Sequence, residues 1–297
     1  MTILMEKSSA KPSETSLTAI LAAAVNIARG AGSVLSEGLA ALANHRGRAL
    51  QFKSSDIDPV TEYDIRSEKF IVRELRQRFP THHIIGEEGG IYQIQNPQSS
   101  FKNYTWQIDP LDGTVNFAHG FPMFCVSLGL LIDGVPSVGV VYNPATDEMF
   151  AAAQGHGATR NDMPIRVSIT PVLKHALLIT GFSYDTHTSD SNIKNFLGFQ
   201  HNAQATRRIG SSALNLCFTA TGQLDGYWEM KVKPHDIVAG IVLVREAGGT
   251  VTNFDGGDDI LDTLLIVASN GLIHREMLDV LKAADDRPST LKNSEND

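Results

Sequence analysis

The feature that most limits the fold is a change of pattern near Pro171, from paired strands to alternating strands and helices. Before this point, "FCVSLGLLI" and "VPSVGVVYN" are β-rich runs separated only by Asp133-Gly134, a dipeptide suited to a two-residue hairpin turn. The segments "EMFAAAQG" and "GATRND" continue the same meander. This part of the chain is therefore predicted to form an antiparallel sheet.

Beyond Pro171, the strands "ALLITGF", "DGYWE" and "TLLIVAS" are interleaved with segments of helical periodicity at 190–201, 213–221, 237–247 and 273–284. Such alternation is typical of layered α/β structure. The sequence thus predicts an α+β subdomain at 16–170, an α/β subdomain at 171–285, and polar disordered tails at 1–15 and 286–297.

Two helices are expected before the meander. Residues 16–37 have apolar side chains at helical spacing, and a second helix is predicted to start after Thr61 and to end at Pro80. The stretch "TEYD" at its start has the form of a capping box, in which Asp64 closes the first turn.

Charge and cysteine content narrow the class of protein. The formal net charge is -8, which gives no indication of the broad basic surface that nucleic-acid-binding proteins use. The two cysteines, Cys125 and Cys217, have apolar neighbours and fit buried thiols in a reducing compartment. The N-terminal residues lack a secretory core, and the best apolar run, 125–141, is interrupted by polar residues and a proline. We expect a soluble cytoplasmic protein with no nucleic-acid or membrane partner.

The stretch "WQIDPLDGTVNF" at 106–117 places Asp109 and Asp112 three positions apart at the end of a predicted strand. Asp112-Gly113 could simply form a turn. Alternatively, the two carboxylates share a cation, because oxygen-rich acidic clusters suit Mg²⁺, Mn²⁺ or Ca²⁺. Gly113-Thr114 would then begin a short helix whose exposed N–H groups could hold a phosphate.

Three other acidic stretches have the same character, since each lies where a strand ends or a helix begins. They contain Asp58 and Asp64, Glu87 and Glu88 ("GEEGG"), and Asp236 ("KPHDIVAG"). Each has a simpler interpretation: Asp64 as a capping-box residue, Asp236 as an N-cap, and Glu87 as a solvated turn residue. Together they supply enough carboxylates from separate segments for a site that holds two or three divalent cations.

At this point the sequence resembles the inositol monophosphatase family of magnesium-dependent, lithium-sensitive phosphatases. The matching stretches are "DPVTEYD" (58–64), "GEE" (86–88), "DPLDGTVNF" (109–117) and "WEMKVKPHDIVAGIVLVREAGG" (228–249), in the family's order and with closely similar spacings. The resemblance implies an αβαβα sugar-phosphatase fold, with an antiparallel N-terminal sheet, a mixed C-terminal sheet and helices between them. It also implies a homodimer and a small phosphorylated metabolite as substrate.

The resemblance further implies roles for individual residues. The metal ligands would be Glu87, Asp109, the carbonyl of Leu111, Asp112 and Asp236, binding two to three Mg²⁺ ions, with Mn²⁺ possible and with Lys53 on a mobile segment beside the weakest site. Catalysis would use Thr114 paired with Asp64 to activate water, together with Glu87, with Glu88 behind the ligands. Substrate would contact Gly113, Thr114, Gly210, Ser211, Ser212, Glu229 and Asp236.

This assignment agrees with the chemistry of phosphate monoesters, whose uncatalysed hydrolysis is among the slowest known reactions. Paired metal ions neutralise the phosphate, lower the pKa of bound water and align the attacking and leaving atoms. One position departs from many family members, which have tryptophan where this chain has His235. A hydrogen bond or packing role is favoured for His235, because an all-oxygen magnesium site seldom includes a lone histidine.

Three alternatives remain open. A haloacid-dehalogenase-type phosphatase also uses a "DGT" motif, with an aspartate nucleophile, but its two aspartates are separated by one residue and not by two. Within the family, the substrate could be histidinol phosphate, fructose 1,6-bisphosphate, NADP or 3'-phosphoadenosine 5'-phosphate, with Arg207-Arg208 as a candidate second phosphate site. A non-catalytic regulatory protein on this fold is the third. The sequence favours an inositol-1-monophosphatase.

Overall fold

The computed structural model describes residues 16–44, 51–52, 59–92, 103–183 and 191–285. The two predicted tails and the candidate residues Lys53 and Asp58 lie outside these ranges.

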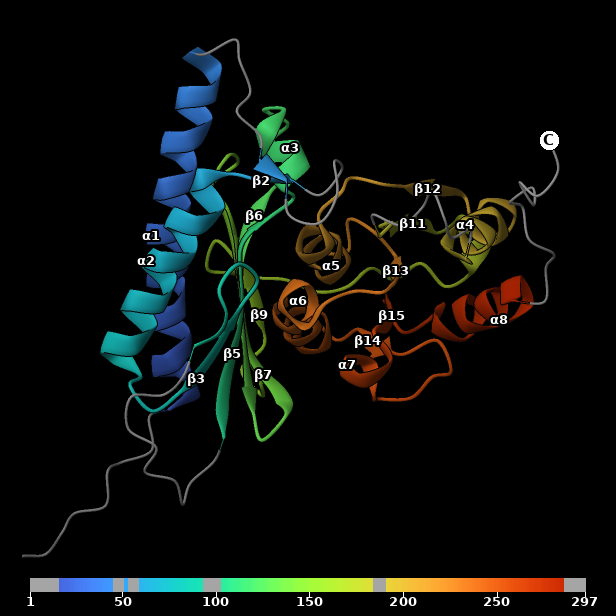
Figure 1. The fold of residues 1–297 in the computed structure, drawn as a ribbon. Coiled ribbons are helices and arrows are strands. Elements are labelled where there is room, and N and C mark those ends of the chain that lie inside the picture. The colour runs from blue at the N-terminus through green and yellow to red at the C-terminus, as the bar shows by residue number, and fades with distance from the viewer. Residues whose placement is uncertain (1–15, 45–50, 53–58, 93–102, 184–190, 286–297) are drawn as a thin grey trace, which may run out of the picture.

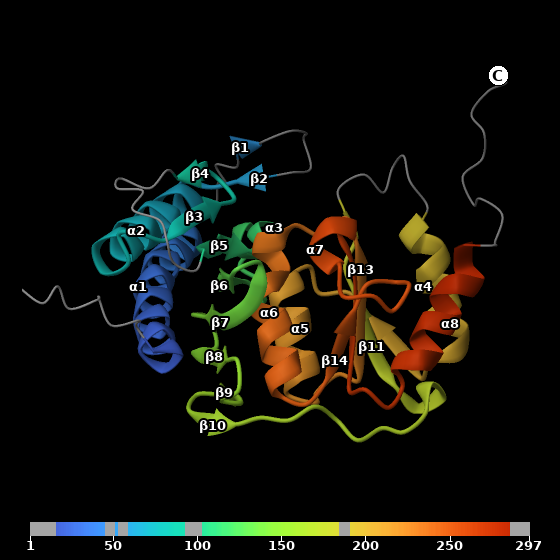
Figure 2. The same ribbon diagram turned by 90° about the horizontal axis from the view of Figure 1, so that it is seen from below.

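The described residues form alternating layers of helices and sheets. Figures 1 and 2 show these layers in two perpendicular views. Helices α1 (Leu17–Asn44) and α2 (Glu62–Arg78) cover one face of a first sheet. Helices α5 (Ser212–Ala220) and α6 (Pro234–Glu246) lie between the two sheets. Helices α4 (Ser191–Asn202) and α8 (His274–Asp285) cover the outer face of the second sheet. The predicted αβαβα layering is confirmed.

The first sheet has the strand order β10-β9-β8-β7-β6-β5-β3-β4. Its strands are β3 (His83–Gly86), β4 (Gly90–Tyr92), β5 (Tyr104–Asp112), β6 (Cys125–Ile132), β7 (Val135–Asn143), β8 (Glu148–Ala153), β9 (Ala158–Arg160) and β10 (Met163–Pro164). Neighbouring strands are antiparallel except β3 and β5, which run parallel. The sheet is therefore mixed, and the prediction of antiparallel pairing fails at this one pair. The parallel pair brings the ends of β3 and β5 to the same edge of the sheet.

The second sheet has the order β12-β11-β13-β15-β14 and is mixed, as predicted. Its strands are β11 (Leu177–Thr180), β12 (Ala205–Arg207), β13 (Gly226–Met230), β14 (Thr250–Thr252) and β15 (Leu265–Ser269). Shorter elements complete the described chain: β1 (Gln51–Phe52), β2 (Pro59–Val60), α3 (Thr114–Ala118), a 3₁₀ turn at Leu173–His175, and α7 (Ile260–Thr263). The first sheet ends at Pro164 and the second starts at Leu177, and the domain boundary at 170/171 stays a prediction.

Local sequence signals fixed two of these elements as predicted. Thr61 caps α2, and Asp64 at its third position closes the capping box. Asp133 and Gly134 join β6 to β7 with φ values of 52° and 82°. Both angles are positive, as a type I′ turn requires, so the predicted two-residue hairpin turn is confirmed.

Helix α1 is longer than the predicted 16–37. It also corrects the expectation that 125–141 is the best apolar run in the chain. By length and composition, Leu17–Leu42 is apolar enough to cross a membrane. Its buried side chains, however, belong to the core between the helix pair and the first sheet. Small residues let the helix approach closely: a Cβ on Gly30 would overlap the ring of Phe70 on α2. The segment thus has the packing of a core helix.

Candidate active site

The predicted pair of aspartates lies at an irregular end of β5. Asp109 is paired with Ser127 of β6 and Asp112 with Cys125, so two residues on β5 face one residue on β6. Such a bulge fits Pro110, which has no N–H to donate to the ladder. The N–H of Leu111 turns back to Asp109 Oδ1 at 2.9 Å. Both aspartates are nearly buried, at 2% and 9% exposure.

Gly113 follows the bulge and sets the direction of the next turn. Its φ is 89°, and a Cβ there would lie 2.8 Å from the carbonyl oxygen of Met123. Only glycine adopts this conformation in this space without strain. Thr114 then begins the short helix α3, as predicted, and its side chain faces back toward β5.

Thr114 contacts Asp64 of α2, fifty positions earlier in the chain. Thr114 Oγ1 lies 3.1 Å from Asp64 Oδ1 and 3.1 Å from the carbonyl oxygen of Leu111. The other oxygen of Asp64, Oδ2, accepts from the N–H of Thr61 at 2.8 Å and from its hydroxyl at 2.5 Å. Asp64 therefore closes the capping box and holds Thr114 at the same time, so capping and the predicted pairing with Thr114 are compatible, while the catalytic role of the pair stays a prediction.

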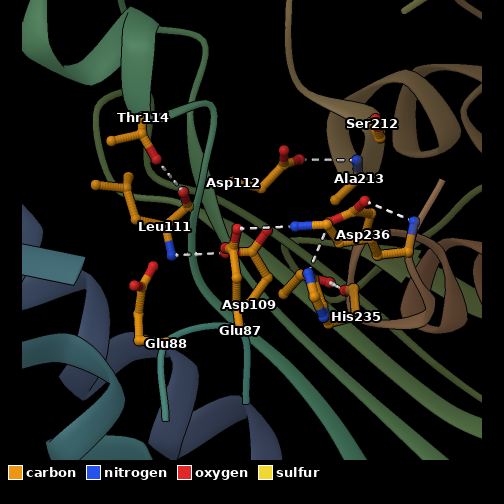
Figure 3. Close-up of polar contacts among 12 residues, drawn as sticks. Glu87, Glu88, Asp109, Leu111, Asp112, Thr114, Ser212, Ala213, His235 and Asp236 are labelled. Carbon is orange, nitrogen blue, oxygen red and sulfur yellow. Dashed lines mark hydrogen bonds and ion pairs between the residues drawn. The ribbon is translucent and has the colours of Figure 1, made fainter. Parts of the chain in front are cut away.

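Glu87 and Glu88 follow β3 at the edge where β5 also ends. The N–H of Glu87 donates to the carbonyl of Ile108 on β5 at 3.2 Å. The Glu87 carboxylate lies beside Asp109, and the ammonium of Lys233 is 3.8 Å from its Oε1 (Figure 3). Glu88 is half-buried and lies apart from this pair in Figure 3. Lys233 was not among the predicted residues.

Asp236 reaches the same place from the first turn of α6. Its interpretation as the N-cap is wrong, because Lys233 is the N-cap and Pro234 the first helical residue. Asp236 Oδ2 instead accepts from the N–H of Lys233 at 2.9 Å, across the first turn of α6. His235 is buried at 8% exposure, and its Nε2 is 3.4 Å from Asp236 Oδ1; the choice between packing and a hydrogen bond for this residue stays a prediction.

The four carboxylates are close enough to perturb one another (Figure 3). Burial raises the pKa of Asp109 well above its usual range, and the charges of Glu87, Asp112 and Asp236 raise it further. Burial raises the pKa of Asp112 to about 7, with Asp236 adding to the shift, while hydrogen bonds from Ser211 and Ala213 oppose it. Like charges in a buried site raise each other's pKa in this way unless a cation compensates them.

This donor set fits hard divalent cations, because it consists of carboxylate oxygens and the Leu111 carbonyl. Within the described ranges, no three Asp, Glu, His or Cys side chains are grouped as a complete metal cage. One of these carboxylates is already bonded to donors of the protein: Asp112 Oδ2 accepts from Ser211 Oγ at 2.6 Å and from the Ala213 N–H at 2.8 Å. The metal-ligand roles of these residues stay a prediction.

Glu229 of β13 is 7% exposed, so it is a buried carboxylate and not a residue of the exposed strand surface, the simpler interpretation of a strand glutamate. Its Oε2 accepts from Tyr227 Oη at 2.6 Å and from Ser212 Oγ at 3.0 Å. Gly181 leaves the space for this carboxylate, since a Cβ there would overlap both oxygens. Burial raises the pKa of Glu229 to about 7, although the two hydrogen bonds lower it.

Residues 210–212, at the start of α5, contact both Asp112 and Glu229. Gly210 is exposed, with a φ of 79°, and its carbonyl and that of Ile209 face the amide of Asn116. Ser211 caps α5 and donates to Asp112, so its hydroxyl serves the carboxylate. Ser212 serves Glu229. The predicted residues thus converge, whereas Arg207 is exposed and donates to the carbonyl of Thr206.

The family match and the names of the relatives identify the chain as a phosphoric monoester hydrolase. The chain belongs to the inositol monophosphatase family, whose model matches residues 16–286. An inositol-1-monophosphatase of Synechocystis sp. is 48% identical over 236 residues, covering 79% of this chain and 80% of that protein. A protein named Nus factor SuhB, from Pasteurella multocida, is 38% identical and covers 87% of this chain and 94% of its own length. The inositol monophosphatase structure from Anabaena (Nostoc) sp. PCC 7120 superposes with a TM-score of 0.79 at 42% identity, covering 91% and 97%. The family is generally metal-dependent.

Proposed function

We propose that this protein is a Mg²⁺-dependent inositol-1-monophosphatase, which hydrolyses myo-inositol 1-phosphate to myo-inositol and phosphate. The observation that carries the proposal is that Thr114 Oγ1 contacts both Asp64 and the carbonyl of Leu111, which lies between Asp109 and Asp112 in the sequence. This places a hydroxyl that can orient water next to a group of oxygens that can hold cations. The names of the relatives from Synechocystis and Anabaena support the choice of substrate.

The proposed cation ligands are Glu87, Asp109, the carbonyl of Leu111, Asp112 and Asp236. Two to three Mg²⁺ ions, or Mn²⁺, would neutralise the phosphate, lower the pKa of bound water and align the attacking and leaving oxygens. The chain's contribution is to gather these oxygens on rigid element ends. The buried carboxylates repel one another without a cation, which makes the site selective for a multiply charged ion.

Thr114 and Asp64 are the proposed water-activating dyad. By donating its proton to Asp64, the Thr114 hydroxyl is left with an oxygen that accepts a hydrogen bond from the attacking water. Asp64 stays fixed because Thr61 donates to its other oxygen. The N–H groups of Gly113 and Thr114, at the start of α3, are proposed to contact phosphate oxygens.

The cyclitol side of the substrate is proposed to meet Glu229, Gly210, Ser211 and Ser212. Tyr227 and Ser212 both donate to Oε2 of Glu229, so Oε1 is the oxygen expected to accept from substrate hydroxyls. A site built to accept such a bond discriminates strongly against an analogue that lacks the hydroxyl.

A substrate panel tests the proposal. Phosphate release with Mg²⁺ should be most efficient, by kcat/KM, for myo-inositol 1-phosphate compared with histidinol phosphate, fructose 1,6-bisphosphate, NADP and 3'-phosphoadenosine 5'-phosphate. A higher kcat/KM for another member of the panel would replace the substrate but keep the reaction. A trapped phosphoaspartyl intermediate would contradict direct attack by water. Absence of turnover with the whole panel would favour a non-catalytic role, for which relatives named Nus factor SuhB give a precedent in name.

Four further expectations belong to this proposal. We propose a homodimer, to be measured by light scattering, and inhibition by lithium, to be measured in the same phosphate-release assay. A cytoplasmic location and the division into subdomains at 170/171 are proposed on the same basis.

Glu229 gives a prediction about pH. Folding raises its pKa from 4.5 to about 7, so the folded state binds more protons than the unfolded state between these values. Stability without metal therefore falls as pH rises from about 4.5 to about 7, by about 3 kcal/mol for this group. In Glu229→Gln this contribution is absent, and chemical unfolding in EDTA at pH 5 and pH 8 should show a smaller loss of stability than in the wild type.

The matched control is Glu37→Gln, which changes an exposed carboxylate paired with Arg66 on the outside of α1 and α2. This variant should retain the wild-type loss between pH 5 and pH 8. An equal loss in Glu229→Gln and the wild type would show that Glu229 is ionised in the folded protein throughout this range.

A further inference from the structure

Helix α2 carries polar side chains on a face that is otherwise apolar and buried. Asp64, Ser67 and Glu68 are 0%, 0% and 2% exposed, and we call them the α2 polar stripe. Their spacing of three and four residues places them next to one another on one side of the helix. Burying such groups is costly unless each is hydrogen-bonded. Their partners therefore show what the stripe holds in place.

Each member of the stripe contacts a different residue of the candidate active site or its loop. Asp64 accepts from Thr114, as described above. Ser67 donates its hydroxyl proton to the carbonyl of Pro110 at 2.9 Å, between the two aspartates of β5. Asp64 and Ser67 thus hold the stretch 110–114, and Glu68 holds a second segment distant from it in sequence.

Glu68 holds the loop that carries Glu87. Its Oε2 accepts from the N–H of Glu88 at 3.0 Å, and its Oε1 accepts from the N–H of Gly89 at 2.7 Å and from Tyr92 Oη at 2.6 Å. All three donors lie within the five residues that follow Glu87. The carboxylate thus ties the backbone just beyond the candidate ligand to α2.

The glycines of "GEEGG" are explained by the same contact. A Cβ on Gly86 would lie 2.5 Å from Glu68 Oε2, and a Cβ on Gly89 would lie 2.9 Å from Oε1. Both distances are too short for real atoms, so the loop approaches Glu68 closely only because glycines stand on both sides of Glu87 and Glu88. The close approach is a property of the loop's sequence as well as of Glu68.

We propose that Ser67 and Glu68 are positioning residues that fix the spacing between the Asp109–Asp112 bulge and the Glu87 loop. The inference rests on the proposed function, because it takes Glu87 and the two aspartates to be cation ligands. A helix is rigid, so hydrogen bonds from two adjacent residues of α2 keep the two segments at a fixed position relative to each other. Hydrogen-bonding partners behind metal ligands commonly set the ligands' orientation and the affinity of the site.

The test is Glu68→Gln in the full-length protein. Glutamine keeps the size of the side chain but replaces one carboxylate oxygen with an NH₂ group. That group cannot accept the hydrogen bonds that the loop donates to Glu68 in the wild type. The Mg²⁺ concentration for half-maximal phosphate release, and that for half of the Mg²⁺-induced rise in melting temperature, should both increase about tenfold or more. At saturating Mg²⁺ the KM for substrate should change little. A role in general stability alone would lower the melting temperature without moving either Mg²⁺ midpoint.

The matched control is Glu74→Gln, on the same helix but paired with Arg73 and Arg78 away from the site. It should keep both Mg²⁺ midpoints. Ser67→Ala is the second variant, because it removes one hydrogen bond and little volume; its midpoints should shift in the same direction by a smaller factor. If Glu68→Gln does not fold, Ser67→Ala decides the question.

The outcomes separate the two proposals. Wild-type midpoints in both Glu68→Gln and Ser67→Ala would overturn the positioning role and leave the phosphatase intact. A Mg²⁺-induced rise in melting temperature without phosphate release from any substrate would contradict the proposed function, while the thermal midpoints would still test Ser67 and Glu68. If Mg²⁺ causes no rise in melting temperature in the wild type, the positioning role is excluded.

Discussion

Replacing Asp109 with asparagine is expected to abolish nearly all phosphatase activity and to stabilise the metal-free protein. Asp109 is the most buried of the four clustered carboxylates that are proposed to bind cations, and the three others repel it. Loss of a proposed cation ligand removes several kcal/mol of transition-state stabilisation, which corresponds to about a 10³-fold loss of kcat. Phosphate release at saturating substrate and Mg²⁺ measures this change.

Although Asp109→Asn should lose activity, it should make the metal-free protein more stable. Asparagine removes a buried negative charge and can still accept from the N–H of Leu111. In EDTA at pH 8, the variant should therefore melt above the wild type, by about 2–4 °C for each kcal/mol gained. The rise in melting temperature on adding Mg²⁺ should be lost.

The control for this substitution is Asp133→Asn. Asp133 lies in the exposed β6–β7 turn at a positive φ that asparagine tolerates, and it accepts from the N–H of Asn103 at 2.8 Å. Wild-type activity is expected there. An active Asp109→Asn enzyme, or one that is less stable than the wild type in EDTA, would contradict a cation site at Asp109.

The parts of the fold that were predicted correctly depend on local signals. The capping box fixed the start of α2, and Asp133-Gly134 fixed the β6–β7 hairpin. The acidic stretches were expected to converge because each one ends a strand or begins a helix. Glu87, Asp109 and Asp236 do meet at such ends.

The parts that were not predicted depend on long-range pairing. Strands β12 and β14 have three residues each, too few for a recognisable periodicity, and only the neighbouring strands define them. The parallel pairing of β3 with β5 is likewise a property of the whole sheet. The bulge between Asp109 and Asp112 was not predicted, because its register is defined only by pairing with β6.

Two site features could have been found in the sequence. Pro is favoured at the first helical position, so "KPHD" already indicates that Asp236 is the third residue of α6 and not its cap. Once Asp64 is fixed as the third residue of α2, Ser67 and Glu68 fall on its side of the helix by spacing alone. What spacing does not reveal is the partner of each side chain, because the Glu87 loop and the β5 bulge arrive from elsewhere in the chain.

Thr114→Val is the second substitution expected to have a large effect. Valine keeps the shape of threonine but lacks the hydroxyl that lies 3.1 Å from Asp64 Oδ1. The attacking water then loses its proposed acceptor, and kcat should fall by about 10²–10⁴-fold, as for other losses of general acid–base groups. KM and the Mg²⁺-induced rise in melting temperature should change little, because the candidate ligands stay in place. Thr114→Ser should keep most of the activity.

A loss of stability alone would mimic part of this result, since leaving buried polar partners unsatisfied costs about 1–3 kcal/mol. Thr219→Val is the matched control: its hydroxyl is equally buried and donates to the carbonyl of Asn215 at 2.9 Å, within α5. That variant should lose similar stability and keep its kcat.

Asp64→Asn completes a cycle with Thr114→Val. Asparagine can preserve the capping box by accepting from Thr61 through its oxygen, but it then directs an NH₂ group at Thr114 and can no longer accept the hydroxyl proton. If the two residues act as one unit, the double variant should be about as slow as either single variant, since groups that act together lose rate non-additively. Rate losses that multiply would mean that Thr114 and Asp64 act independently, and the capping box would then be the whole role of Asp64.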